Sequence, residues 1–462
     1  MVDEKKAELF ERAPIPKAVA TVAIPTVLTS LVMVLYNLAD TYFVGMINDP
    51  VQNAAVTLAA PVILAFNAVN NLFGVGSSSL MSRSLGKKDY DTVRRTSAFG
   101  FYCAIISGLL FSLLCTLFMP QLLNLLGADE TTAQATQAYL HWTVTCGAVP
   151  AILNVVMAHI VRSEGSAMHA GIGTMSGCLL NIILDPIFIL QFDMGAGGAG
   201  LATFISNCVA CTYFFILIYV RRKKSYICIN PKMFGFRKDI VKGVFGVGIP
   251  ASIQNLLNVT GMTILNNFTS AYEAEAVAAM GITYKVNMVA MYISMGMGQG
   301  IMPLISYNYA SGDHKRMKKI FSFTARLALC IALVFMAVYY FGAHTIISLF
   351  MENETIVAYG TRFLRGYCLG IPFLCIDFLA VGVFQAVGKG TYSLIFAILR
   401  KVVLEIPAMI ILNDLFPLYG LAYSQFVAEF VLAIIAIIVL TRFFKGCNRT
   451  KQSEDANVSS AT

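Results

Sequence analysis

The chain has 462 residues, of which 57% are hydrophobic and only 13% are charged. A water-soluble protein carries roughly a quarter of its residues as charged side chains, so this composition excludes a soluble enzyme or soluble binding protein. The net charge of +8 does not indicate a nucleic-acid partner, because the basic residues lie in short loops between long apolar runs. We therefore expect the lipid bilayer to surround most of this chain.

Twelve apolar runs are long enough to cross a bilayer as helices, which takes about 20 residues. The strands of a membrane β-barrel would instead be short segments of alternating hydrophobicity. The sequence therefore predicts an all-α membrane protein with twelve transmembrane helices. In chain order, the predicted spans are 17–45, 53–81, 93–119, 136–161, 167–190, 198–220, 240–268, 276–308, 319–342, 356–386, 392–412 and 417–443.

The loops between these spans alternate in charge. Loops after even-numbered spans contain Lys and Arg, as in 221–224 and 315–319, whereas loops after odd-numbered spans contain neither. Basic loops remain in the cytoplasm. The sequence therefore predicts a multi-pass protein of the plasma membrane, here a bacterial inner membrane, with both termini cytoplasmic. Arg362 and Arg365, at the outer end of the tenth span, depart from this pattern, and the sequence assigns them no role.

The two halves of the chain repeat each other at a nearly constant offset. Each half contains six spans, an even number, so both halves enter the membrane in the same sense. The sequence thus predicts two six-helix bundles related by a pseudo-two-fold axis along the membrane normal, an arrangement typical of secondary transporters. The matching pairs are Pro25 and Pro250, Gly74 and Gly300, Gly86 and Gly312, Pro150 and Pro372, Gly165 and Gly388, and Pro186 and Pro407.

This repeat predicts five consecutive regions. They are a cytoplasmic N-terminus (1–16), an N-lobe with spans one to six (17–222), a basic cytoplasmic linker (223–238), a C-lobe with spans seven to twelve (239–446) and a cytoplasmic tail (447–462). The tail is predicted to be disordered, because it is polar and has no apolar face.

Two carboxylates lie inside predicted spans of the N-lobe. A charge at the bilayer centre costs about 2.5–3.5 kcal/mol on insertion scales, so Asp40 and Asp185 require a function or a partner. Both lie near the outer ends of their spans, at the depth of Thr203 in the sixth span. Tyr36 and Asn181 lie one helical turn deeper on the same faces.

These five residues are the predicted site for a coupling ion. Two carboxylates at one depth repel each other unless a proton or a cation neutralises one of them. Oxygen ligands suit a proton relay or a hard monovalent cation, so Asp40 and Asp185 are candidate sodium ligands, and we expect no cofactor other than H⁺ or Na⁺. The alternative is a set of hydrogen bonds that only joins helices.

The C-lobe carries a different set of charged residues within its spans: Lys285, Asp377, Arg400, Lys401 and Glu405. Asp377 and the pair Arg400 and Lys401 lie at similar depths in the tenth and eleventh spans, which permits a buried ion pair. The sequence leaves two interpretations open, a structural charge network and a contact with substrate or coupling ion. Because the acidic layer of the N-lobe is not repeated here, ion coupling is expected in the N-lobe.

Several segments of the chain carry a family resemblance. They are LADTYFVG (38–45), NLFGVGSSSLMSRSLG (71–86), LNIILDPIFI (180–189), GAGLATFIS (198–206) and VFQAVGKG (383–390). Together with the doubled six-span plan, they resemble the MATE (multidrug and toxic compound extrusion) family, and within it the bacterial MepA-type exporters. The resemblance implies cation-coupled antiport, and it places the family's N-lobe ion network on the same five residues, from Tyr36 to Thr203. Asp377 resembles the acid of the tenth span in other members, whereas the seventh span lacks their carboxylate.

We therefore expect a secondary active efflux antiporter that works by alternating access. It would export cationic or amphipathic drug-like molecules in exchange for protons or sodium ions, function as a monomer, and not be an enzyme. One alternative is a flippase for a lipid-linked or anionic metabolite, which requires a strongly basic lumen that Lys285, Arg400 and Lys401 do not clearly supply. The other is an intramembrane transferase, which requires clustered His, Cys or carboxylate side chains, whereas the histidines are separated along the chain.

Overall fold

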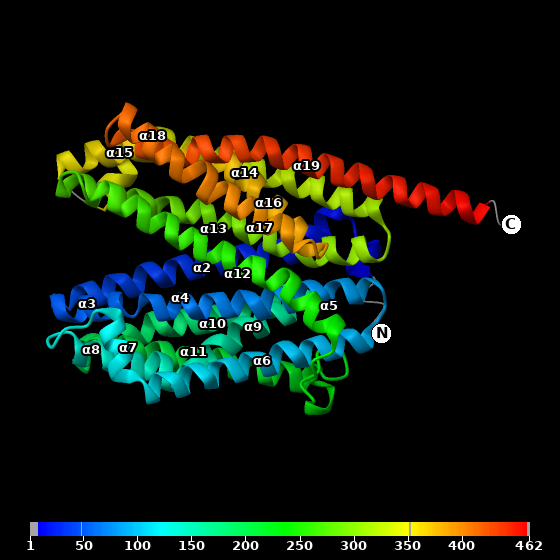
Figure 1. Ribbon diagram of the computed structural model, residues 1–462, viewed down its shortest axis with the longest axis horizontal. Coiled ribbons are helices and arrows are strands. Elements are labelled where there is room, and N and C mark those ends of the chain that lie inside the picture. Colours follow the sequence, from blue (N-terminus) through cyan, green and yellow to red (C-terminus); the bar gives the residue numbers. More distant parts are fainter. Residues whose placement is uncertain (1–7, 48, 351–352, 460–462) are drawn as a thin grey trace. The chain divides into compact units, whose positions relative to one another are not determined.

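The computed structural model describes residues 8–47, 49–350 and 353–459 (Figure 1). These residues form α-helices joined by short π-helical and 3-10 turns, and none of them is in a strand. The prediction of an all-α membrane protein is confirmed for this part of the chain.

The first half of the chain forms six consecutive spans, and several of them are built from more than one helical segment. They are α2 (Ile15–Met46); α3 (Pro50–Leu58) with α4 (Ala60–Asn70), η2 (Asn71–Val75) and α5 (Gly76–Gly86); α6 (Tyr90–Leu117); α8 (Ala133–Leu140) with η3 (His141–Cys146) and α9 (Ala148–Ser163); α10 (Ala167–Pro186) with η4 (Ile187–Gln191); and α11 (Gly195–Arg221). Three short elements lie outside them, η1 (Glu8–Arg12), α7 (Met119–Leu126) and η5 (Pro231–Met233).

The second half repeats this plan. Its spans are α12 (Lys238–Thr269); α13 (Ala274–Ala310); α14 (His314–Ser348); α15 (Glu354–Cys368) with α16 (Ile371–Ala386); α17 (Gly390–Ile398) with η6 (Leu399–Glu405) and α18 (Ile406–Leu415); and α19 (Tyr419–Ser459).

Eleven of these twelve spans are long and apolar enough to cross a bilayer, nine as continuous helices and two as bent pairs, among the described residues. The remaining one, α17 to α18, carries Arg400, Lys401 and Glu405 in its middle. These charged residues lower the hydropathy of this span.

The two bent spans contain the repeated prolines Pro150 and Pro372. The bends are 53° between η3 and α9 and 46° between α15 and α16. A proline has no N–H to donate, and its ring clashes with the carbonyl four residues earlier, here those of Cys146 and Cys368. Both bends occur at these carbonyls, so the sequence repeat marks a repeated break in the fourth and tenth spans.

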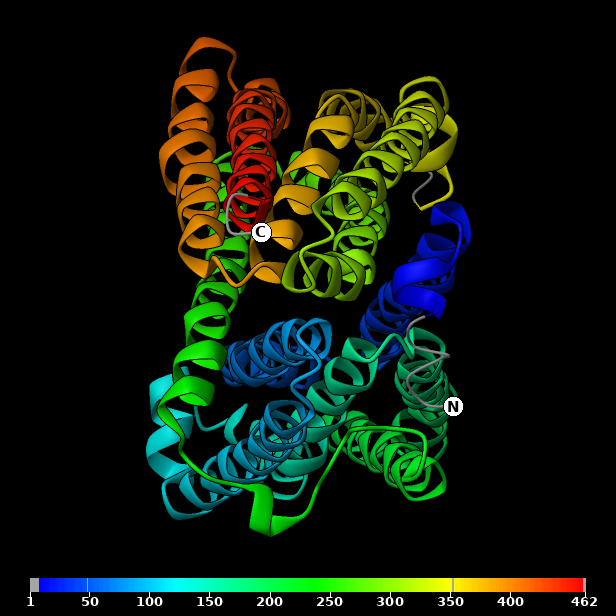
Figure 2. The ribbon, with the colours of Figure 1, turned by 90° about the vertical axis from the view of Figure 1, so that its right-hand side faces the viewer.

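The chain forms two compact units, and Figure 2 shows each of them as a bundle of helices. Unit 1 contains Leu28–Ser252 with the described residues before Phe10, and unit 2 contains Phe10–Val27 and the residues from Ile253 onward. These boundaries differ from the predicted lobes, because 17–27 belongs to unit 2 and 239–252 belongs to unit 1.

Glycines account for this exchange of helix ends. Gly300 of α13 lies so close to α2 that a Cβ on it would be 2.8 Å from the Cα of Ala23. Likewise, Gly248 of α12 lies directly against the backbone carbonyl of Leu72 in η2. Because α2 and α12 remain helical through Pro25 and Pro250, each contributes its two ends to different units.

The polar tail is the other difference from the prediction. Helix α19 continues to Ser459, although 447–462 is predicted to be disordered, and 460–462 lie outside the described residues. Extending an existing helix avoids the cost of nucleating a new one, and Lys, Gln, Glu and Ala in this segment have high helix propensity.

Candidate functional site

The centre of the candidate site in unit 1 is the carboxylate of Asp185, near the end of α10. Its side chain is fully buried, and Asn181, one turn earlier, is 2% exposed. Oδ1 of Asp185 has no hydrogen-bond partner among the described residues. A buried carboxylate oxygen without a donor is rare in folded proteins, so the Asp185 carboxylate is a candidate for binding a proton or a cation.

Close packing of α10 on α11 brings Thr203 to this carboxylate. A Cβ on Gly177 would lie 3.1 Å from the carbonyl oxygen of Ser206, so the two helices approach closely one turn away from Asn181. The Asn181 amide satisfies both neighbours when its Nδ2 donates to Asp185 Oδ2 (2.8 Å) and its Oδ1 accepts from Thr203 Oγ1 (3.3 Å). The amide thus links the hydroxyl of α11 to the carboxylate of α10.

Helix α2 contributes Tyr36 and Asp40 to the same region. Both side chains are half-buried. Asp40 and Asp185 are close enough for their charges to interact, and both act on the phenol of Tyr36. The five residues predicted from depth and helix face therefore belong to one polar region of unit 1, three of them joined by hydrogen bonds and two by charge interaction.

Tyr139 is a member of this region that sequence reasoning missed. This buried residue of α8 interacts electrostatically with both Asp40 and Asp185. Gly200 brings α11 to it, since a Cβ on Gly200 would lie 3.0 Å from the Tyr139 carbonyl oxygen. In the sequence, GLA at 200–202 recurs as GLA at 420–422. This repeat was the available signal, because a repeated glycine marks a close helix contact.

The donor set of unit 1 consists of carboxylate, amide, hydroxyl and phenol oxygens. The described residues contain no group of three or more His, Cys, Asp and Glu that could hold a metal ion. The unpaired oxygen of Asp185 and this oxygen-only set fit a proton or a sodium ion.

Unit 2 contains a buried cluster of mixed charge, centred on Arg400 of η6. Its Nε donates to Glu429 Oε1 (2.7 Å), and its Nη1 lies 3.5 Å from Asp377 Oδ2. The guanidinium also lies over the ring of Phe378, 5.0 Å from its centroid. Because Arg400, Asp377 and Glu429 are each at most 3% exposed, two carboxylates share one cation in a water-poor interior.

Glu429 was also missed by sequence reasoning. It lies on α19, in the apolar run FVAEFVLA, and is fully buried. A lone carboxylate in such a run must find a partner, which was the available signal. The identity of that partner depends on the packing of α19 against η6.

Lys401 and Glu405 form a second ion pair within η6, with 2.6 Å between Nζ and Oε2. Gly261 of α12 makes room for the lysine, since a Cβ there would lie 3.0 Å from Lys401 Cδ. Pro407 has no N–H to donate to the carbonyl four residues earlier, which lies in the π-helical segment η6. Such π-segments recur at functional sites in helical proteins.

Lys285 is not part of this cluster. It is exposed on α13 and forms no ion pair with the other described charged residues. The predicted set in unit 2 therefore divides into four clustered residues and one separate lysine.

Arg362 and Arg365, which the sequence left without a role, have aromatic partners at the end of unit 2. The Arg362 guanidinium lies 5.1 Å from the centroid of the Tyr419 ring and donates to its hydroxyl (3.1 Å). Arg365 lies 5.6 Å from the Tyr340 ring. Such cation–π contacts stabilise exposed cations.

The sequence matches a family model described as MatE over residues 25–187 and 250–411. Two curated relatives, the multidrug export proteins MepA of Staphylococcus saprophyticus and Staphylococcus aureus, are each 34% identical over 432 residues, 93% of this chain and 94% of the relative.

Solved structures are similar over almost the whole chain. One is described as the outward-facing conformation of a multidrug resistance MATE family transporter of the MOP superfamily, with a TM-score of 0.91, 25% identity, and coverage of 96% of this chain and 99% of that one. Another is a MOP superfamily transporter from Pyrococcus furiosus, with the same identity and coverage and a TM-score of 0.87. Its description states that the reverse polarity of its binding pocket suggests a different function.

Proposed function

The chain belongs to the MATE family, and from this premise we propose that it exports cationic or amphipathic drug-like molecules in exchange for protons or sodium ions. It is a multi-pass membrane transporter and not an enzyme. The ion-coupling part of the proposal rests on Asp185. Its carboxylate is fully buried, one of its oxygens has no hydrogen-bond donor, and it interacts electrostatically with the carboxylate of Asp40.

Asp40 and Asp185 bind the coupling ion, with Asn181, Thr203 and Tyr36 as supporting ligands. A bound cation or proton supplies the positive charge that two neighbouring carboxylates need. Asn181 holds Oδ2 of Asp185 at 2.8 Å and thereby leaves the other oxygen for the ion. Ion and substrate are exchanged because they prefer different conformations of an alternating-access cycle, which is sufficient for coupling by mass action.

The charged residues of unit 2 have two different roles in this proposal. Asp377, Arg400, Lys401 and Glu405 form a structural network, because each of them has an ion-pair partner within the cluster. Lys285 lies eleven residues into α13, roughly 16 Å along the helix at 1.5 Å per residue, and is exposed. An exposed ammonium at that depth requires water, so Lys285 lines an aqueous cavity and contacts substrate there.

The substrate class and the topology are part of the same proposal. Relatives named as multidrug export proteins support drug-like substrates, and the charge pattern of the loops supports two cytoplasmic termini. A single chain contains both repeats, so the monomer is the transporting unit.

The test is transport of a fluorescent cationic dye by the full-length protein in vesicles, driven separately by a sodium gradient and a pH gradient. Asp40→Asn removes a titratable group without changing side-chain volume, and we expect it to reduce gradient-driven export by roughly tenfold or more, the scale of typical coupling energies. Glu130→Gln is the matched control, because Glu130 is an exposed carboxylate outside the site. Export by Asp40→Asn at the rate of this control, at equal protein level, would contradict the proposal.

A further inference from the structure

A groove at one end of unit 1 is lined by both basic and apolar side chains. It lies where α9, the end of α11 and the linker after α11 meet. Arg221 and Lys224 supply its positive charge, and Val161, Leu217, Ile218 and Ile227 supply its apolar wall. Such a combination fits a ligand with an anionic head and a hydrocarbon tail.

The linker wall of this groove is fixed to the helices of unit 1. Glu164, which follows α9, accepts hydrogen bonds from Ser225 Oγ (2.6 Å) and from the backbone N–H of Tyr226 (2.8 Å). Further along, the Cys228 N–H donates to Ser97 Oγ (2.9 Å). The groove therefore has a defined shape, and the one carboxylate in its lining already accepts hydrogen bonds from the linker.

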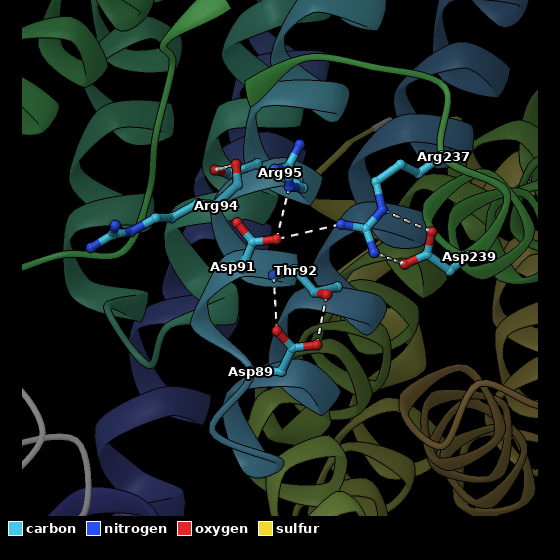
Figure 3. Close-up of polar contacts among 8 residues, drawn as sticks. Asp89, Asp91, Thr92, Arg94, Arg95, Arg237 and Asp239 are labelled. Carbon is cyan, nitrogen blue, oxygen red and sulfur yellow. Dashed lines mark hydrogen bonds and ion pairs between the residues drawn. The ribbon is translucent and has the colours of Figure 1, made fainter. Parts of the chain in front are cut away.

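The basic residues around the linker fall into two classes. Figure 3 shows Arg237 between two carboxylates, 3.0 Å from Asp239 and 3.4 Å from Asp91. Hydrogen bonding to Asp239 raises the pKa of this guanidinium above its usual value. In contrast, Arg221 and Lys224 form no ion pair with a carboxylate in the described part of the chain. Their charges remain available to an external anion.

Next to the groove, α11 exposes apolar side chains. Ile216 is 58% exposed and Val220 is 71% exposed, which in a membrane helix places them against acyl chains. Arg221 follows directly, at the last residue of the span. The groove therefore lies beside an apolar exposed surface of α11, at the end of the span where the basic residues begin.

We propose that this groove binds an anionic phospholipid of the cytoplasmic leaflet. Its phosphate lies between Arg221 and Lys224, and one acyl chain lies along Leu217 and Ile218. Basic pockets at the cytoplasmic ends of membrane helices recognise lipid head groups in this way, and charge-assisted hydrogen bonds from Arg to phosphate are among the strongest polar contacts in proteins.

The test is a lipid titration of the purified full-length protein in a neutral detergent, followed by native mass spectrometry. The probes are phosphatidylglycerol, phosphatidylcholine with the same acyl chains, and glycerol phosphate without acyl chains. We expect phosphatidylglycerol to bind, and the double variant Arg221→Gln with Lys224→Gln to weaken its binding by roughly tenfold or more, as expected for lost hydrogen bonds to a charged group.

The matched control is Arg222→Gln with Lys223→Gln. It removes the same net charge from the same four-residue run, but neither residue lines the groove. We expect this control to change the affinity for phosphatidylglycerol by less than about twofold, since no groove contact is lost. Melting temperatures without lipid establish that both variants are folded.

Three outcomes would overturn the proposal. Equal weakening by the two double variants would mean that only net charge attracts the lipid. Equal affinity for phosphatidylcholine would mean that the groove does not select an anionic head group. Binding of glycerol phosphate as tightly as phosphatidylglycerol would mean that the site holds a free phosphate ester instead of a membrane lipid.

Discussion

The polar interiors of the two units neutralise their carboxylates differently. In unit 1, Asp185 is buried beside Asp40, one of its oxygens has no hydrogen-bond partner, and no Lys or Arg in the described part of the chain forms an ion pair with either carboxylate. In unit 2, Asp377 and Glu429 both contact Arg400. In the proposed mechanism, the unit 1 carboxylates depend on an ion from outside. In unit 2, by contrast, Arg400 and Lys401 balance two of the three clustered carboxylates, which are Asp377, Glu405 and Glu429. The two halves therefore share a sequence repeat but differ in the charged residues that they bury.

The largest expected effect is the loss of ion coupling in Asp185→Asn. The amide cannot take up a proton or neutralise a bound cation, so we expect gradient-driven export to fall to the level of empty vesicles. The free energy of unfolding should rise at the same time, because a buried unpaired charge is removed. Dye transport and thermal melting of the purified protein check the two parts, and a stable variant with full export activity would contradict the proposed role of Asp185 in ion binding.

Arg400→Met tests unit 2. Removing one partner of a buried ion pair costs about 3–5 kcal/mol, so we expect a marked fall in melting temperature. Arg326→Met, at an exposed position on α14, is the control and should have little effect.

A triple variant separates a structural role from a functional one in this cluster. Asp377→Leu, Arg400→Met and Glu429→Met together replace the charges by apolar side chains of similar volume, which is often neutral or stabilising. If the cluster is structural, this variant regains both stability and export. Recovered stability without export would instead assign the cluster a part in transport.

Thr203→Val should have a moderate effect. It removes the hydroxyl that Asn181 contacts while keeping the shape of the side chain, and one hydrogen bond contributes about 1 kcal/mol. We expect a several-fold loss of apparent ion affinity, measured from the sodium and pH dependence of export. Thr212 lies on the same helix, and its hydroxyl donates to the backbone carbonyl of Cys208. Thr212→Val should therefore leave that dependence unchanged.

The smallest expected effect is that of Lys285→Gln. Because this lysine forms no ion pair in the described part of the chain, its removal should leave the melting temperature unchanged. If it lines the substrate cavity, the substitution should lower the KM for cationic dyes by a few-fold, since repulsion between like charges is removed, and leave a neutral dye unaffected. An equal change for both dyes would place Lys285 outside the substrate path.

The sequence was sufficient for the spans and for most members of the polar region in unit 1. Apolar runs define helices because a bilayer offers no hydrogen bonds to unpaired backbone. Helix periodicity placed Asn181 on the same face as Asp185, and span length placed Thr203 at the same depth. These are local properties of the chain, readable without knowing which helices are neighbours.

Only the tertiary structure shows which side chains from different helices contact each other. Glu429 pairs with Arg400, and Tyr139 lies near Asp40 and Asp185, because particular helices approach each other. That approach depends on glycines such as Gly200. The periodicity of the sequence does not show which helix such a glycine contacts. The exchange of helix ends at Pro25 and Pro250 has the same origin. Spans follow from transfer of each segment into lipid, whereas pairing follows from the fit of one helix surface against another, which only the assembled bundle specifies.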